Sequence, residues 1–313
     1  MADLIKPKAL KKGDTIGVFA PGGVIYDYHI EDARTYWENA GFNLHIEPQT
    51  LYKDDQFAGT PEQKIEAMHK LFSDPKIDAV LCARGGNGCI HILDRIDYDL
   101  IAKNPKLFIG FSDVTLIHHA INKKAGLQTI HAPMLKEYRK ECNDQNKDVA
   151  LDFLMGNTTE NLFRTEKVDI VSQGKATGSL FGGNMSLLRT LMMTGDKYLP
   201  DLSGAILVLE DWNEELSRID LFLGGLKVAG VFEKVAGVVV GISPTLDTGV
   251  NPFGRSMEQI LRENVGNVNI PIVMNAPMGH GDLNYPFPVG AKAELDATTG
   301  QPTLKLLESP FLL

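Results

Sequence analysis

A serine in the sequence Gly110-Phe111-Ser112-Asp113 has the surroundings that a nucleophile needs. The apolar run 107–109 predicts a short buried strand, and apolar residues at helical spacing over 114–121 predict a helix. Ser112 would then lie on a tight turn between strand and helix, near backbone N–H groups that can stabilise a developing oxyanion. The alternative is that Ser112 and Asp113 only cap the helix, as these residue types commonly do.

An acid and a base that could serve this serine occur in the second half of the chain. A buried-looking strand ends in Glu210, although acids at strand ends are often caps or surface charges. His280 stands in a glycine-rich loop after another apolar strand, and histidine is the usual general base near neutral pH. The esterase elbow G-x-S-x-G is not met, because Val114 replaces its second glycine. Ser112, Glu210 and His280 still give a nucleophile, an acid and a base in chain order.

Two glycine-rich segments could bring backbone close to that serine. In Arg84-Gly85-Gly86, an N–H of Gly85 or Gly86 could help to form an oxyanion hole while Arg84 contacts an anionic group. The same segment could also be a plain turn between strand and helix. In Gly182-Gly183-Asn184 the glycines permit close backbone approach, so Asn184 is a candidate substrate-binding residue; the alternative is a turn that opens the next helix.

Composition narrows the class of protein. The chain has 313 residues, 43% of them hydrophobic, with a net charge of −9 that argues against a nucleic-acid partner. No apolar run is long enough to cross a membrane, the first residues lack a secretory signal, and no residue spacing suggests a metal or cofactor site. Three cysteines cannot form a disulfide framework, and Cys82 is interpreted as a small strand residue. A cytoplasmic protein is expected.

The remaining histidines near the serine have simpler interpretations. His118 and His119 fall on the predicted helix after Ser112 and are interpreted as residues of its surface. His131 follows a probable strand and is interpreted as a satisfied structural or pocket-lining residue.

Strands and helices alternate in the first half, which predicts a parallel sheet with helices on its faces. Strands are expected at 15–20, 42–46 and 77–82, and helices at 30–40, 60–73 and near 89–96. The turns after three strands, 21–23, 84–86 and 110–113, should meet at the carboxyl edge of the sheet, where ligands bind.

The whole chain is expected to be an α/β protein of two domains. Residues 1–160 form the N-terminal parallel-sheet domain with the nucleophile, 161–178 cross between domains, and 179–313 form a smaller, β-rich α/β domain with the acid and the histidine. The C-terminal strands are expected at 204–209, 235–241, 270–274 and 291–296, with a helix at 218–229.

The chain resembles the LD-carboxypeptidases, serine-type peptidases that include murein tetrapeptide carboxypeptidases and microcin-immunity peptidases. The resemblance spans nearly the whole chain and rests on Ala20-Pro21, Arg84-Gly85-Gly86-x-Gly88, Gly110-Phe111-Ser112-Asp113, Gly182-Gly183-Asn184, Leu209-Glu210-Asp211 and Gly279-His280. It implies that Ser112 is the nucleophile, that Glu210 orients the histidine, and that His280 is the base. It also implies that the N–H of Asp113 and one from Gly85-Gly86 hold the oxyanion.

The resemblance further implies a site in the cleft between the domains, a homodimer, and a small peptide substrate. The bond cleaved would join an L-centre to a terminal D-amino acid, as in murein tetrapeptides. Asn87 replaces a frequent tyrosine of the family, Ala132 replaces a glycine, and Phe287 stands where leucine is commoner. These departures leave the substrate open.

Three other functions remain as alternatives. The first, within the family, is cleavage of a peptidyl or aminoacyl nucleotide; Phe181 or Trp212 could then contact adenine, and both could equally be core residues. The second is a two-domain binding protein without chemistry. The third, a dinucleotide-binding oxidoreductase, is disfavoured because 84–88 lacks the G-x-G-x-x-G spacing.

Overall fold

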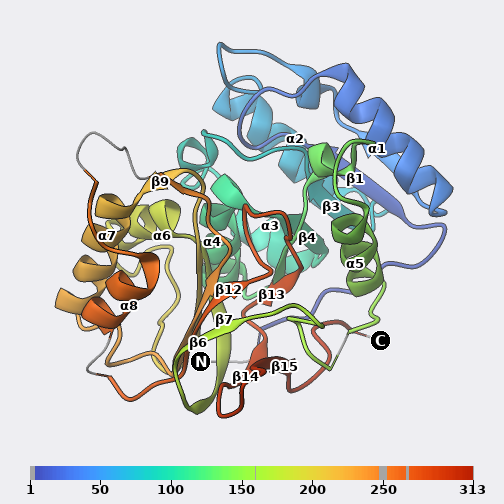
Figure 1. Cartoon of the computed structure of the whole chain (residues 1–313). Coiled ribbons are helices and arrows are strands. Elements are labelled where there is room, and N and C mark those ends of the chain that lie inside the picture. Colours follow the sequence, from blue (N-terminus) through green and yellow to red (C-terminus); the bar gives the residue numbers. More distant parts are fainter. Residues whose placement is uncertain (1–3, 159, 247–251, 266–267, 313) are drawn as a thin grey trace.

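The computed structural model describes residues 4–158, 160–246, 252–265 and 268–312, which form two α/β domains with mixed sheets (Figure 1). The first sheet has the order β13-β5-β4-β3-β1-β2. Its strands are β1 (Thr15–Phe19), β2 (Asn43–Ile46), β3 (Ala79–Cys82), β4 (Leu107–Gly110), β5 (Thr129–His131) and β13 (Phe287–Val289). Strands β1 to β5 are parallel, whereas β13 arrives from the second half and pairs antiparallel with β5.

The helices of the first half follow its strands. They are α1 (Asp27–Asn39), α2 (Pro61–Ser73), α3 (Tyr98–Lys103), α4 (Thr115–Ala125) and α5 (Asp144–Leu154). Helix α2 begins as its sequence predicts, because the Thr60 hydroxyl accepts from the N–H of Gln63 and a proline occupies the first turn. The helix expected near 89–96 is wrong: only a 3₁₀ turn, Cys89–His91, forms there. Apolar residues of this segment, such as Ile92 and Leu93, are buried, but they lie in successive turns.

The second sheet has the order β15-β14-β7-β8-β10-β12-β6. Its strands are β6 (Asp169–Ser172), β7 (Lys175–Asn184), β8 (Ile206–Glu210), β10 (Gly237–Gly241), β12 (Ile272–Ala276), β14 (Lys292–Asp296) and β15 (Thr303–Leu306). Strands β7, β8, β10 and β12 are parallel, whereas β6, β14 and β15 pair antiparallel with their neighbours. The stretch that we expected to cross between domains therefore contributes β6 and the start of β7.

In the part of the second domain that the structure describes, three helices and a small ribbon accompany the sheet. The helices are α6 (Met185–Met192), α7 (Leu216–Val228) and α8 (Met257–Val265), and the ribbon pairs β9 (Glu214–Glu215) with β11 (Thr245–Leu246). Helices α7 and α8 pack against each other at one side of the molecule (Figure 1). One hydrophobic cluster includes Val18 of β1 and Val208 of β8, so the core is continuous between the two sheets. Within the described ranges, no helix is long and apolar enough to cross a membrane.

The strand order brings the chemically interesting segments together. Strands β1, β3 and β4 are neighbours, so the turns that follow their carboxyl ends lie along one edge of the first sheet. In the second sheet, β8 ends at Glu210 and β12 leads to His280. Strand β13 follows the His280 loop in sequence and pairs with β5 of the first sheet. This pairing attaches the end of the His280 loop to the first domain.

Candidate active site

Ser112 lies on the sharp turn between β4 and α4, as its sequence predicts. The residues Ser112–Val114 form a 3₁₀ turn, and Ser112 has a φ of +63°, which non-glycine residues adopt only when their surroundings impose it. The turn is tight enough that a Cβ on Gly110 would lie 2.8 Å from Cγ1 of Val114. A hydroxyl on such a turn stands at the carboxyl edge of the sheet, clear of the core.

The loop after β3 packs against this turn. The buried Asp113 carboxylate accepts a hydrogen bond of 2.9 Å from the N–H of Cys89, and burial raises the pKa of that carboxyl. A Cβ on Gly85 would lie 3.1 Å from the Ser112 Oγ and 3.3 Å from the backbone nitrogen of Asp113. The Gly85 backbone therefore lies directly against the serine hydroxyl, beside the N–H that follows it in sequence.

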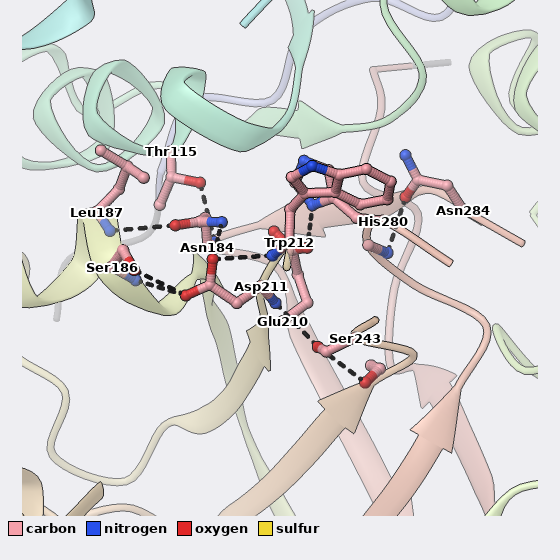
Figure 2. A network of polar contacts seen from close by, with 12 residues as sticks. Thr115, Asn184, Ser186, Leu187, Glu210, Asp211, Trp212, Ser243, His280 and Asn284 are labelled. Atoms are coloured by element: carbon pink, nitrogen blue, oxygen red, sulfur yellow. Dashed lines mark hydrogen bonds and ion pairs between the residues drawn. The ribbon is translucent and has the colours of Figure 1, made fainter. Parts of the chain in front are cut away.

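His280 is held by a buried carboxylate. Glu210 is fully buried at the end of β8, and its Oε2 lies 2.5 Å from the Nδ1 of His280 (Figure 2). Gly279 has a φ of +104°, and a Cβ there would come within 2.6 Å of Glu210, so glycine lets the loop close over the carboxylate. With Nδ1 donating to Glu210, Nε2 is the ring nitrogen left for proton transfer.

The electrostatic surroundings favour the protonated form of His280. Burial lowers the pKa of the imidazole, but the opposing attractions together outweigh burial. These attractions come from the charge and hydrogen bond of Glu210 and from the charges of Asp211 and Glu137. The pKa of His280 therefore lies above its ordinary value of 6.5.

Ser112 and His280 line one cavity of about 460 Å³, together with Arg84, Gly85 and Gly86. The ring of Phe111 lies 4.9 Å from the imidazole, centroid to centroid, and forms part of the wall. In the described parts of the chain, no hydrogen bond joins the Ser112 hydroxyl to the His280 ring. Such bonds are commonly long in free enzymes and tighten when substrate binds.

Several lining residues were not singled out from the sequence. They are Pro133, Met134, Lys136, Glu137, Cys142, Asn143, Asn146, Gly281, Asp282 and Asn284. Most belong to the connection between β5 and α5, Asn146 lies on the first turn of α5, and the others belong to the loop that carries His280. A polar stretch directly after another strand of the parallel sheet was the signal that could have identified the first group.

Arg84 and Lys136 contribute cationic side chains to the lining of the cavity. The guanidinium of Arg84 donates one hydrogen bond of 2.7 Å to the carbonyl of Val24, which fixes its position. The ammonium of Lys136 lies 3.6 Å from a carboxylate oxygen of Glu137. The cavity can therefore accommodate an anionic group of a ligand.

The structure does not bring Asn184 to this cavity. Its side chain is buried, its Nδ2 donates to Asp211 at 2.8 Å, and its Oδ1 accepts from the N–H of Leu187 at 3.2 Å (Figure 2). Asn184 is therefore the N-cap of α6, which was one of the two interpretations of its motif. The neighbouring Gly183 permits a close approach of β7 to Thr115 at the start of α4.

The interpretation of His118 and His119 as surface residues is wrong. Both are buried, because α4 packs between α3, α6 and β7 and has no solvent-facing side there. The ring nitrogens contact the carbonyls of Gly110 and Gly182 at 2.9 Å each. Burial lowers the pKa of His118 to about 3 and that of His119 to about 4, so both are neutral. His131 is also buried, stacked 4.5 Å from the ring of Phe287.

The two aromatic candidates differ sharply. Phe181 is 1% exposed and belongs to the core. Trp212 is 54% exposed, lines the cavity, and has its ring 5.7 Å from that of His280 (Figure 2).

A metal site is a separate question. No group of three or more His, Cys, Asp or Glu side chains in the described parts of the chain could hold an ion.

The fold and cavity define a two-domain α/β protein with polar and titratable groups gathered where the domains meet. The chain belongs to the LD-carboxypeptidase family, and is therefore a peptidase by family. Residues 16–132 match the LD-carboxypeptidase N-terminal domain, and residues 177–295 match the LD-carboxypeptidase C-terminal domain.

Similar proteins extend along nearly the whole chain. A probable murein peptide carboxypeptidase of Bacillus subtilis is 33% identical over 303 residues, which cover 93% of this chain and 91% of the relative. The crystal structure of an MccF-like protein from Bacillus anthracis is 26% identical, with a TM-score of 0.85, and 97% of this chain and 99% of that chain are covered. The structure of a muramoyltetrapeptide carboxypeptidase from Oxalobacter formigenes is 25% identical, with a TM-score of 0.80, and 94% of this chain and 100% of that chain are covered.

Proposed function

We propose that this protein is a serine carboxypeptidase that hydrolyses the amide bond between an L-centre and a terminal D-amino acid, as in murein tetrapeptides. The observation that carries the proposal is the cavity lined by both Ser112 and His280, with the buried Glu210 carboxylate 2.5 Å from the imidazole. Membership of the LD-carboxypeptidase family supports the same substrate class.

The proposed reaction proceeds through an acyl-enzyme. His280 takes the proton of Ser112 while the serine oxygen attacks the carbonyl carbon, and Glu210 stabilises the resulting imidazolium. His280 then gives this proton to the leaving nitrogen, which releases the D-amino acid. A water molecule then attacks the ester carbonyl while the same imidazole takes its proton. The imidazole returns this proton to the Ser112 oxygen as the ester bond breaks, which regenerates the free serine and a neutral histidine.

Backbone N–H groups are proposed to hold the oxyanion. The donors would be the N–H of Asp113 and one from Gly85-Gly86; the packing of the Gly85 backbone against the Ser112 side chain supports this choice. One such donor is worth about 3–4 kcal/mol of transition-state stabilisation in comparable sites. Arg84, anchored on the Val24 carbonyl, would use its remaining N–H groups to pair with the free carboxylate of the substrate.

A Gly85→Ala substitution is expected to lower kcat by about 10-fold or more, because the new methyl group would press on the reacting atoms and small misplacements are costly. Its Cβ would lie 3.0 Å from the Ser112 Cβ and 3.1 Å from the Oγ. The matched control is Gly225→Ala on α7, where a Cβ meets no atom within 4 Å. Steady-state kinetics and thermal unfolding would be compared; wild-type kcat in the Gly85 variant would contradict the prediction.

A second candidate function is cleavage of an aminoacyl or peptidyl nucleotide. The exposed ring of Trp212 favours it, because a nucleobase could stack on this ring at the cavity. Phe181, the other aromatic candidate, is buried and does not line that cavity.

Purified protein should be tested on a defined L,D-tetrapeptide, on its all-L isomer and on an aminoacyl sulfamoyl adenosine. We expect release of the terminal D-amino acid with a kcat/KM at least about 100-fold above that for either other compound. Faster cleavage of the nucleotide conjugate, together with its loss in Trp212→Ala, would favour the second function instead.

The homodimer, the cytoplasmic location and the domain boundaries at 160 and 179 remain proposals from the resemblance and the sequence. Sedimentation of the purified protein would test the first of these.

A further inference from the structure

The loop that carries His280 has its shape fixed by internal hydrogen bonds. The N–H of Tyr285 donates to the carbonyl of Pro277 at 2.7 Å and closes the loop at its base. Across its middle, the N–H of Gly279 donates to the buried side chain of Asn284 at 3.0 Å (Figure 2). Gly279 is directly bonded to His280, so a shift of Asn284 is passed to the imidazole.

The first domain holds this loop through the side chain of Asn146, on the first turn of α5. Its Nδ2 donates to the carbonyl of Asp282 at 2.9 Å, and its Oδ1 accepts from the N–H of Asn284 at 2.9 Å. Because a carbonyl only accepts and an N–H only donates, these partners fix which end of the amide is nitrogen. The side chain therefore pairs with the loop as a neighbouring strand would.

Asn143, three residues earlier, has a different role. Its Oδ1 caps α5 by accepting from the N–H of Gln145, and its Nδ2 is a second donor, at 3.1 Å, to the Asp282 carbonyl. Of these two asparagines, Asn146 is the one that bonds two main-chain groups of the loop, whereas Asn143 bonds one. The two side-chain hydrogen bonds of Asn146 both go to the loop and do not cap its own helix. The asparagine at this position therefore has a role other than helix capping.

We propose that Asn146 is a positioning residue, which sets the His280 imidazole relative to Ser112 through the main chain of the loop. The inference rests on the proposed function and deepens it. Ser112 stands on the first domain and His280 on a loop from the second, so the distance between hydroxyl and imidazole depends on contacts that join the domains at this point. Asn146 supplies such a contact from the domain that carries the serine.

The first test replaces Asn146 by alanine, which removes both bonds, and by aspartate, which keeps the acceptor but sets a carboxylate oxygen against the Asp282 carbonyl. Both variants are expected to lose about 10–100-fold in kcat. KM is expected to change by less than about threefold, because uniform substrate binding is not affected. Thermal unfolding would confirm that each variant is folded at the assay temperature.

The matched control is Asn157→Ala, three residues past the end of α5, where the exposed side chain donates to a carboxylate oxygen of Asp152. We expect its kcat to equal that of the wild type, because Asn157 is not among the residues that line the cavity. A loss of kcat in Asn157→Ala as large as that in the Asn146 variants would overturn the specific role of Asn146.

A double-mutant cycle distinguishes positioning from a general structural effect. If Asn146 acts through the imidazole, Asn146→Ala should cost almost nothing further in a His280→Ala background. The same fold-loss in both backgrounds, or a wild-type kcat in Asn146→Ala, would overturn the inference. If His280→Ala alone kept the wild-type kcat, the proposed function itself would fail, and that result is distinct from either of the other two.

Discussion

Replacing Ser112 with alanine is expected to lower kcat by about 10⁴–10⁶-fold, because the Ser112 hydroxyl is the group that forms the acyl-enzyme in the proposed mechanism. The loss should fall on kcat rather than on KM, since the walls of the cavity remain. The fold should survive, because alanine meets the same backbone demand, a φ of +63°, at a similar cost to serine. Kinetics on an L,D-tetrapeptide, together with thermal unfolding, would check the expectation.

The control for this substitution is Ser217→Ala, an exposed position on α7 that should leave kcat unchanged. A fluorophosphonate should label wild-type protein at Ser112, as read by mass spectrometry of the peptides, and should not label the Ser112 variant there. Full peptidase activity without the Ser112 hydroxyl would remove the serine from the mechanism, whatever its geometry.

The turn that carries Ser112 was predictable because its signals are local. A short apolar run, a turn residue and an apolar period of about 3.6 lie within 15 residues of each other and predict β4, the turn and α4. The start of α2 was equally clear, since Thr60 and the following proline form a cap that depends on no distant contact. What these signals could not give is the positive φ of Ser112, which tertiary packing imposes.

Burial from distant segments was what the sequence could not reveal. His118 and His119 are polar residues on a helix, so a solvent-exposed face was the simplest interpretation. The face is instead covered by β7 of the other domain, whose Gly182 carbonyl partners His119. In the same way, β13 joins the first sheet after a gap of more than 150 residues in sequence from β5, and nothing local predicts that pairing.

The cavity was predictable only where a motif marked it. Arg84, Gly85 and His280 were singled out and line it, whereas Asn184 had a similar motif and caps a helix instead. Glycine pairs indicate a close backbone approach but do not say to what: Gly85 approaches Ser112, and Gly183 approaches Thr115 of α4. Polar loop residues such as Asn146 carry no periodic signal, so their part in the wall emerges only from the three-dimensional arrangement.

Glu210→Gln is expected to lower kcat by about 10³–10⁴-fold, the second-largest effect. The substitution keeps the size of the side chain but removes the charge that stabilises the imidazolium, and the amide can hold the ring in the wrong tautomer. Glu210 is fully buried, so no solvent replaces the lost attraction. The exposed Glu233→Gln is the control and should retain wild-type kcat. Kinetics of a Glu210 variant within about threefold of wild type would exclude the ion pair from catalysis.

The dependence of kcat/KM on pH is a second test of the role of Glu210. The base must be neutral, so wild-type kcat/KM should rise with pH through an apparent pKa above 6.5, the ordinary value for histidine. Glu210→Gln removes the largest attraction that opposes burial, so the midpoint should move to lower pH. The contribution of His280 to the free energy of unfolding of the wild type should instead fall as pH rises. A raised pKa in the folded state stabilises it fully below the unfolded pKa, and this contribution is lost as pH rises through the folded pKa. Equal midpoints in wild type and variant would mean that Glu210 does not control the proton on His280.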